Sequence, residues 1–304
     1  FVYADKSLGT QMMATGEVMS IGNSFEAAMM KAVSSIELGM DTLTHKPFEE
    51  LSDDEIVDHM HVQDAERVFC VYEALKRGID HETIYRITKI DWWFLDKMQH
   101  LADLEKGLAN CEGVLTEAQY REAKKYGFQD KTIKRLAKVD KLPVENYRAG
   151  FKMVDTCAAE FSANTPYFYS TYDGDNEAAE FIAEKEAKAA EKGEPRKKQV
   201  LVFGSGPIRI GQGIEFDYCS VHCVWTLKNH GCEAILVNNN PETVSTDFDT
   251  GDRLYFDPLN PESVDNIIAT EKPDACVVQF GGQTAIKLAK HMDEIGLPIL
   301  GTPA

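Results

Sequence analysis

The sequence predicts two kinds of domain in one chain, a small all-helical domain followed by a Rossmann-like domain with a parallel β-sheet. Three observations lead to this prediction. Capped helical patterns follow one another from about residue 42 to residue 157. A short apolar run at 200–203 then ends in a glycine-rich turn, which is typical of a strand buried on both faces of a parallel sheet. Beyond this run, strand-like and helical patterns alternate.

The composition places the chain among globular proteins and argues against two classes of partner. With 304 residues, of which 43% are hydrophobic, the chain can bury more than one core. Its formal net charge of −18 argues against a nucleic-acid surface, because such a surface needs clustered Lys and Arg. No apolar run approaches the roughly 20 residues of a membrane-spanning helix. We therefore expect no nucleic-acid partner and no membrane association.

The cysteines and histidines predict neither a disulfide framework nor a metal site. The seven cysteines are odd in number, widely spread and without a C-x-x-C pair. Cys219 and Cys223 have the spacing of one helix face, but the second pair that a zinc site needs is missing. The histidines between residues 42 and 157 also lack paired spacing. Reduced thiols in a cytoplasmic protein are the simplest interpretation.

The first forty residues predict a strand, a turn and a helix. The strand is expected over 17–21 and the turn at Gly22. Ser24 is a plausible N-cap for a helix whose apolar residues keep to one face.

Helix after helix is expected in residues 41–161. Ser52 with Glu55, and Thr116 with Gln119, have the spacing of capping boxes. A helical face with Val68, Val71, Tyr72 and Leu75 should end at Gly78. Asp91 can cap a longer helix, with Phe94, Met98, Leu101, Leu104 and Leu108 on its apolar face. We expect at least one of the adjacent Trp92 and Trp93 to pack in the core, with a contact surface as the alternative.

Residues 162–197 predict a connector. Their second half, NEAAEFIAEKEAKAAEKGEPRKK, contains strong helix formers but few apolar residues. This composition favours a solvated helix or a linker.

Residues 198–304 predict the parallel sheet. Strands are expected at 199–203, 234–238, 275–279 and 298–300, with helices between them, one of them capped by Ser263. The loops 204–213, 238–243 and 281–283 all follow strands, so they should meet at the carboxyl edge of the sheet, where α/β domains bind ligands. Tight turns without further function are the alternative for each loop. Asp247 and Asp249 could hold a cation, although a solvated loop is the simpler interpretation.

The glycine-rich loop 204–213 first suggests a binding site for a nicotinamide dinucleotide, and two features oppose this hypothesis. The dinucleotide motif G-x-G-x-x-G requires a glycine where the chain has Arg209. The second strand of such a site ends in an acidic residue that holds the ribose, whereas this chain has Asn238, Asn239 and Asn240 there.

Three runs carry a family resemblance: GSGPIRIGQGIEFDYC, VNNNPETVSTDFDTGDRLYFDP and VVQFGGQTAIKLA. They resemble the start of the second synthetase half of carbamoyl phosphate synthetase large subunits. The upstream runs QMMATGEVMSIG and FKMVDTCAAEF resemble the same family in the same order. The resemblance implies the tail of the first ATP-grasp domain in 1–40, an oligomerisation domain in 41–161, a connector in 162–197 and a pre-ATP-grasp domain in 198–304. Met13 departs from the lysine that the family often has.

The resemblance also implies a function. The family makes carbamoyl phosphate, for pyrimidine and arginine biosynthesis, from bicarbonate, two ATP and ammonia that a glutamine amidotransferase small subunit releases. ATP and magnesium, or manganese, serve the whole enzyme, and we expect no cofactor, no catalytic residue and no metal ligand in this segment. Carbamate passes between the two active sites through a tunnel. Positions matched to the family's motifs place five residues along it: Glu17, Arg209, Gly213, Glu215 and Glu242.

Both ends of the chain suggest a fragment with neither ATP-grasp fold complete, so we expect no turnover from the chain alone and self-association through the helical domain. The alternative is a non-catalytic oligomeric scaffold or binding module. For Arg209 and Glu215, the alternative to a tunnel role is an ion pair that braces the loop.

Overall fold

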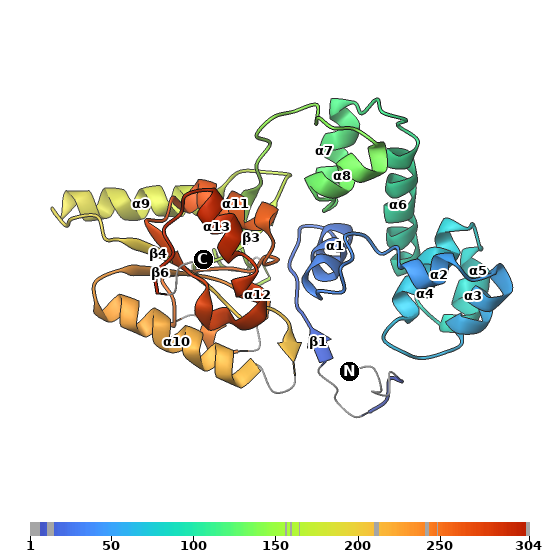
Figure 1. The fold of residues 1–304 in the computed structure, drawn as a ribbon, viewed down its shortest axis with the longest axis horizontal. Helices are drawn as coiled ribbons and strands as arrows, with labels where there is room; N and C mark the ends of the chain where they lie inside the picture. Colours follow the sequence, from blue (N-terminus) through green and yellow to red (C-terminus); the bar gives the residue numbers. More distant parts are fainter. Residues whose placement is uncertain are drawn as a thin grey trace. The chain divides into compact units, whose positions relative to one another are not determined.

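The computed structural model describes residues 7–10, 15–155, 157–158, 160–163, 165–209, 213–240, 243–247 and 249–301. The chain divides into two compact units (Figure 1). The helical unit comprises residues 1–13 and 24–146, and the α/β unit comprises residues 14–23 and 147–304. This division confirms the predicted fold class, since a helical domain and a mostly parallel sheet are both present.

Eight helices make up the described part of the helical unit: α1 (Phe25–Ser35), α2 (Lys46–Glu49), α3 (Asp53–Met60), α4 (Arg67–Lys76), α5 (His81–Thr88), α6 (Trp92–Ala109), α7 (Glu117–Lys125) and α8 (Asp130–Ala137). The predicted caps are confirmed. Ser24 accepts a hydrogen bond from the backbone N–H of Ala27, and both predicted capping boxes are formed.

Helix α4 is the most deeply buried helix of this unit, with every residue from Phe69 to Leu75 buried. It ends as its sequence predicts, because Gly78 adopts a positive φ of 81° and the backbone N–H of Ile79 bonds to the carbonyl of Ala74. Helices α3 and α6 pack against it.

The expected burial of the aromatic residues at the start of α6 is wrong. Trp92, Trp93 and Phe94 are 45%, 49% and 43% exposed. Leu95 takes the inward position, one residue beyond the expected Phe94, and is fully buried. Periodicity gave the correct face from Met98 onward, but it could not show that the rings of the first turn pack only at their edges, on Phe25 of α1 and His81 of α5.

The described α/β unit contains strands β1 (Thr15–Glu17), β2 (Gly150–Met153), β3 (Tyr167–Thr171), β4 (Gln199–Phe203), β5 (Ile208–Arg209), β6 (Glu233–Val237), β7 (Arg253–Tyr255) and β8 (Ala275–Val277). Its α-helices are α9 (Glu177–Glu191), α10 (Gly213–Asn229), α11 (Pro261–Glu271), α12 (Gly282–Ile286) and α13 (Ala289–Glu294). Two short 3₁₀ helices, η1 (Val244–Thr246) and η2 (Gln279–Gly281), follow β6 and β8.

Six of these strands form one sheet in the order β2-β3-β7-β6-β4-β8, parallel except for β2. Every residue of β4 is buried, as the unbroken apolar run predicted. Helix α10 covers one face through Val224. Helices α9, α11 and α13 cover the other face, where Phe203, Ile235 and Tyr255 form the core.

Several details differ from expectation. The strand expected at 275–279 ends at Val277, and the one expected at 298–300 contributes only an isolated bridge between Ile299 and Cys276. The segment 14–23 belongs to the α/β unit, and its strand is 15–17 rather than 17–21. Strands β2 and β3 add residues 150–153 and 167–171 to the sheet, although they were expected in the helical domain and the connector. Helix α11 is capped by Asn260, whose side chain accepts from the backbone N–H of Ser263, so the predicted cap at Ser263 is wrong.

Candidate functional site

Two runs that lie far apart in the sequence meet as a small sheet near the glycine loop. Strand β1 pairs antiparallel with β5, so that Thr15 lies opposite Arg209 and Glu17 opposite Ile208. The backbone N–H of Met19 also donates to the carbonyl of Asn239, in the loop after β6. Glu17 and Arg209 are therefore held on adjacent strands at the carboxyl edge of the main sheet.

Asn238 joins the loops at that edge. Its side-chain oxygen accepts from the backbone N–H groups of Gly206 (3.1 Å) and Asn239 (3.0 Å). Its side-chain nitrogen donates to the hydroxyl of Ser245 (3.4 Å). Because Asn238 is fully buried, these bonds hold the loops after β4 and β6 in a fixed relation.

The glycines of these loops allow close packing between loops. A Cβ on Gly204 would lie 2.5 Å from Cγ of Asn238, and one on Gly206, whose φ is +70°, would lie 2.7 Å from Cγ2 of Thr284. A Cβ on Gly282 would meet the ring of Phe216 at 2.7 Å. The three predicted loops therefore interlock at one edge, which is closer packing than a tight turn alone would require.

Three buried polar atoms at this edge have no hydrogen-bond partner in the described part of the chain. They are Oγ of Ser205, Oδ1 of Asp217 and Oδ1 of Asn239. The other oxygen of Asp217 accepts from the backbone N–H of Ser245 (3.3 Å). Buried polar atoms without partners are uncommon, because desolvation is costly, and each needs a partner such as an ordered water or a bound group. Sequence reasoning missed Ser205 and Asp217, although both lie inside the GSGPIRIGQGIEFDY run.

The structure places four of the five predicted tunnel residues. Glu17 is exposed on β1, Arg209 is half-buried on β5, Gly213 begins α10, and Glu215 is exposed in the first turn of that helix. Glu242 lies outside the described residues, as does Met13. Whether Arg209 and Glu215 line a tunnel or brace the loop stays a prediction.

The described residues contain no group of three or more His, Cys, Asp or Glu side chains that could hold a metal ion. Asp247 and Asp249 are exposed, as in a solvated loop. The structure forms no disulfide among the seven cysteines. Burial raises the pKa of Cys276 to about 12 and that of Cys223 to about 11. The thiols of Cys276 and Cys223 are therefore poor nucleophiles near neutral pH.

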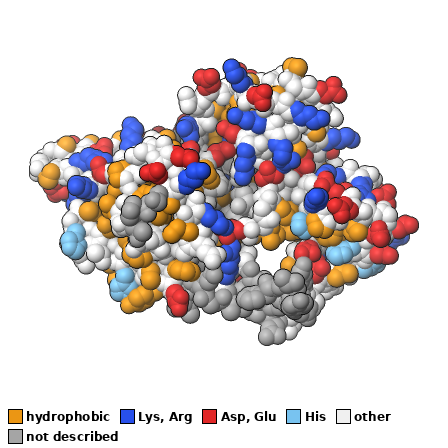
Figure 2. Space-filling view, in the orientation of Figure 1, with side chains coloured by type: hydrophobic (Ala, Val, Ile, Leu, Met, Phe, Trp, Pro, Cys, Tyr) orange, Lys and Arg blue, Asp and Glu red, His pale blue; other side chains and the backbone are white. Residues whose placement is uncertain are grey.

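Two further properties of the described residues are their charge distribution and their hydropathy. On the face drawn in Figure 2, Lys and Arg side chains are interspersed with Asp and Glu side chains. Within the described chain, no helix combines the length and the hydrophobicity needed to cross a membrane.

Comparison with known proteins identifies the two units. A family model for the carbamoyl phosphate synthase preATP-grasp domain matches residues 196–304, and one for the oligomerisation domain of the carbamoyl-phosphate synthetase large chain matches residues 17–152.

Relatives match along the whole chain. The carbamoyl phosphate synthase large chains of Agathobacter rectalis and Lachnoclostridium phytofermentans are 51% and 52% identical to it, over 310 and 311 residues. Each alignment covers 100% of this chain but only 28% of the relative. Both family models agree with the identity found along the whole of this chain. The chain therefore belongs to the family of carbamoyl phosphate synthase large chains.

Proposed function

We propose that this chain supplies part of the wall of a carbamate tunnel within a carbamoyl phosphate synthase. The enzyme would make carbamoyl phosphate in the cytoplasm, for pyrimidine and arginine biosynthesis. Its substrates would be bicarbonate, two ATP and ammonia, which a glutamine amidotransferase small subunit would release. The tunnel residues of this chain would be Glu17, Arg209, Gly213, Glu215 and Glu242.

The observation that carries this proposal is the pairing of β1 with β5, since it holds Glu17 and Arg209 on adjacent strands. The unpartnered oxygens of Ser205, Asp217 and Asn239 give it further support. A passage for carbamate needs hydrogen-bonding walls, because an apolar wall would reject a polar intermediate. Glycine at position 213 would leave room for the bore.

ATP and its metal ion would act elsewhere in the enzyme. Bicarbonate and later carbamate would each be phosphorylated by ATP, with magnesium or manganese offsetting the charge of the phosphates. The role of this chain would be to conduct the intermediate and to shield it from water.

Gly213→Leu in the intact enzyme tests the tunnel. The larger side chain should narrow the bore, so that bicarbonate-dependent ATP hydrolysis persists while carbamoyl phosphate synthesis falls by about tenfold or more. Tyr218→Leu is the matched control, because Tyr218 lies on the same helix and is 62% exposed. If synthesis and hydrolysis fall together, or neither changes, Gly213 is a turn residue and does not line a tunnel.

The alternative function, a non-catalytic scaffold, makes the same prediction for the chain alone and a different one for the intact enzyme, in which Gly213→Leu should then leave carbamoyl phosphate synthesis unchanged. We expect no carbamoyl phosphate from this chain when ammonia, bicarbonate and ATP are supplied. Turnover would contradict the proposal that catalysis needs other parts of the large chain.

We also propose that the helical unit self-associates, which its match to an oligomerisation domain supports. The exposed aromatic rings at the start of α6 offer apolar contact area. Light scattering across a concentration series should show masses above one chain, and Trp92→Glu should lower them more than Val114→Glu, at an exposed apolar position in the same unit. A single-chain mass at every concentration would contradict self-association.

A further inference from the structure

Helix α10 carries a row of exposed aromatic rings. Tyr218 and Trp225 are 62% and 45% exposed, and His222 between them is also exposed. The rings contact one another in series: the centroids of Tyr218 and His222 are 4.2 Å apart, and those of His222 and Trp225 are 5.2 Å apart. The three side chains therefore form one continuous surface along the helix, and we call it the aromatic row. Exposed surfaces of this kind mark sites of interaction more often than single exposed rings do.

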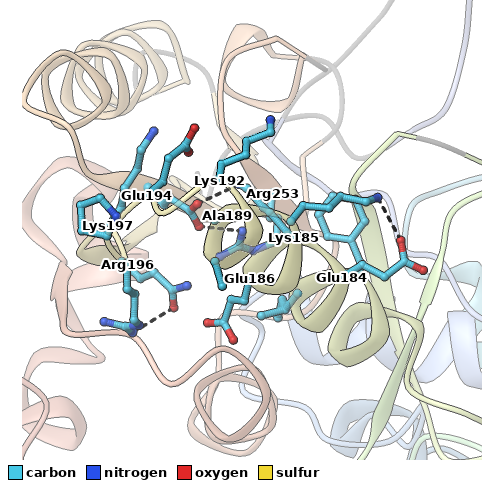
Figure 3. Close-up of a pocket in the computed structure, with 16 residues that line it drawn as sticks. Glu184, Lys185, Glu186, Ala189, Lys192, Glu194, Arg196, Lys197 and Arg253 are labelled. Carbon is cyan, nitrogen blue, oxygen red and sulfur yellow. Dashed lines mark hydrogen bonds and ion pairs between the residues drawn. The ribbon is translucent and has the colours of Figure 1, made fainter.

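The aromatic row also lacks charge. From Tyr218 to Leu227, α10 contains no Lys, Arg, Asp or Glu, although these residues make up 27% of the chain. Helix α9 of the same unit shows the pattern of a solvated helix. Beside the cavity drawn in Figure 3 its exposed residues include Glu184, Glu186 and Lys188, and Glu184 pairs with Lys188 at 3.3 Å. An outer face with aromatic rings and without charge is instead typical of a helix that is covered on both sides.

The aromatic row continues from a residue of the proposed tunnel wall. Glu215 lies three residues before Tyr218 and seven before His222, and residues at these intervals share one side of a helix. Like the rings, Glu215 is exposed. A tunnel that shields its contents from water needs a second wall opposite the first. The surface that faces Glu215 would therefore also reach the aromatic row on the same side of α10.

The relatives contain enough further chain to supply that second wall. Each alignment covers 100% of this chain but only 28% of the relative, so most of a large chain lies outside the matched part. The absence of charge also suits a contact within one large chain, because permanent interfaces are more hydrophobic than those that form and separate.

We propose that the aromatic row packs against the part of the large chain that closes the carbamate tunnel opposite Glu215. This inference rests on the proposed function. The contact seals the tunnel, because the rings exclude water beside the passage. The partner surface is apolar and presents hydrogen-bond acceptors to the hydroxyl of Tyr218 and the indole N–H of Trp225.

Hydroxyl-radical footprinting with mass spectrometry tests this contact, because Tyr, His and Trp side chains are oxidised readily where water reaches them. In this chain alone the aromatic row should be oxidised about as fast as in the urea-unfolded chain. In the intact large chain its oxidation should be severalfold slower. Equal rates in the two proteins would overturn the proposal. Protection in this chain alone would overturn it too, with a second copy as the partner if the protection grows with concentration.

Trp225→Glu in the intact large chain tests the seal. A carboxylate in the dry contact should open it, so that Tyr218 is oxidised nearly as fast as in this chain alone. Carbamoyl phosphate synthesis should then fall while bicarbonate-dependent ATP hydrolysis persists. Tyr85→Glu is the matched control, because Tyr85 is an exposed ring of α5, in the other unit, and neither readout should change. Full protection of Tyr218 in the Trp225 variant would contradict the contact.

The footprint separates this inference from the tunnel itself. Protection of the aromatic row in the intact large chain, together with no effect of Gly213→Leu, would keep the contact and remove the tunnel. Uncoupling by Gly213→Leu without protection of the row would keep the tunnel and remove the contact. Leucine at position 218 keeps the face apolar, so Tyr218→Leu stays a valid control in the Gly213→Leu experiment.

Discussion

The two units of this chain differ in how far apart in the sequence their stabilising contacts lie. The helical unit is marked by local signals, such as the capping boxes at Ser52 and Thr116, which are formed three residues apart. The α/β unit depends on partners from distant segments, since its sheets combine strands that begin at residues 15, 150, 167 and 199. Local signals are therefore enough to outline the first unit but not the second.

Arg253→Met should have the largest effect, because Arg253 joins two strands and a helix of the α/β unit. Burial by itself would lower the pKa of Arg253, but Glu271 and Glu233 raise it above its ordinary value, so the residue stays charged. Its removal leaves the fully buried carboxylate of Glu271 unpaired. We expect a loss of about 3 to 5 kcal/mol in the free energy of unfolding, measured by urea titration.

Arg196→Met is the matched control for that change. Arg196 pairs with Asp274 at 2.9 Å, but both side chains are partly exposed, at 48% and 39%. The expected loss is at most about 1 kcal/mol. Equal losses in the two variants would show that the Arg253 network does not hold the α/β unit together.

Gly281→Ala tests whether the interlocked loops support the same unit. A Cβ there would lie 2.5 Å from the carbonyl oxygen of Phe203 and would also meet that of Gly204. Neither backbone atom can move freely, so we expect a loss of about 1 to 3 kcal/mol in the same titration. Gly251→Ala is the control, because its Cβ would meet its nearest atom at 3.4 Å. If both variants are as stable as the parent, the loops are looser than the structure implies.

Glu26 predicts a pH dependence in the helical unit. Burial raises the pKa of this carboxyl, but hydrogen bonds from His100 and Lys97 outweigh burial and lower it below 4.5. A lowered folded-state pKa stabilises the fold above pH 4.5, and this stabilisation is lost as the pH falls through the folded-state pKa. Unfolding at a series of pH values should show that decline.

Glu26→Gln should remove the part of the acid dependence that comes from this carboxyl. Glu122→Gln, at an exposed position of α7, should leave the dependence unchanged. The same slope in the parent and in the Glu26 variant would mean that this carboxyl has equal pKa values in the folded and unfolded chain.

The sequence alone predicted the fold class, both capping boxes, the bounds of β4 and the meeting of three loops at one edge. It did not predict that residues 150–153 and 167–171 join the sheet, because a local strand pattern does not show which other strand it will pair with. It also missed Ser205 and Asp217, since a serine and an aspartate beside glycines look like turn residues until their burial is known. The pairing of the Glu17 strand with the Arg209 strand came only from the structure, since the family resemblance placed the two residues along one path without pairing their strands.

The smallest expected effect belongs to the helical unit and has the opposite sign. Gly107 lies in the last two turns of α6, is exposed, and has no atom within 4 Å of the position where a Cβ would stand. Gly107→Ala should therefore stabilise the helical unit by about 0.5 to 1 kcal/mol, because alanine restricts the unfolded chain and favours the helix without a clash. Trp92 and Trp93 lie in this unit and Trp225 in the other, so fluorescence of a Trp225→Phe background reports the helical unit alone. Destabilisation in that background would show that an alanine side chain at position 107 clashes with a neighbour of α6. The two units would then not differ in the way proposed, in which the loops require glycine at 281 and the helix accepts alanine at 107.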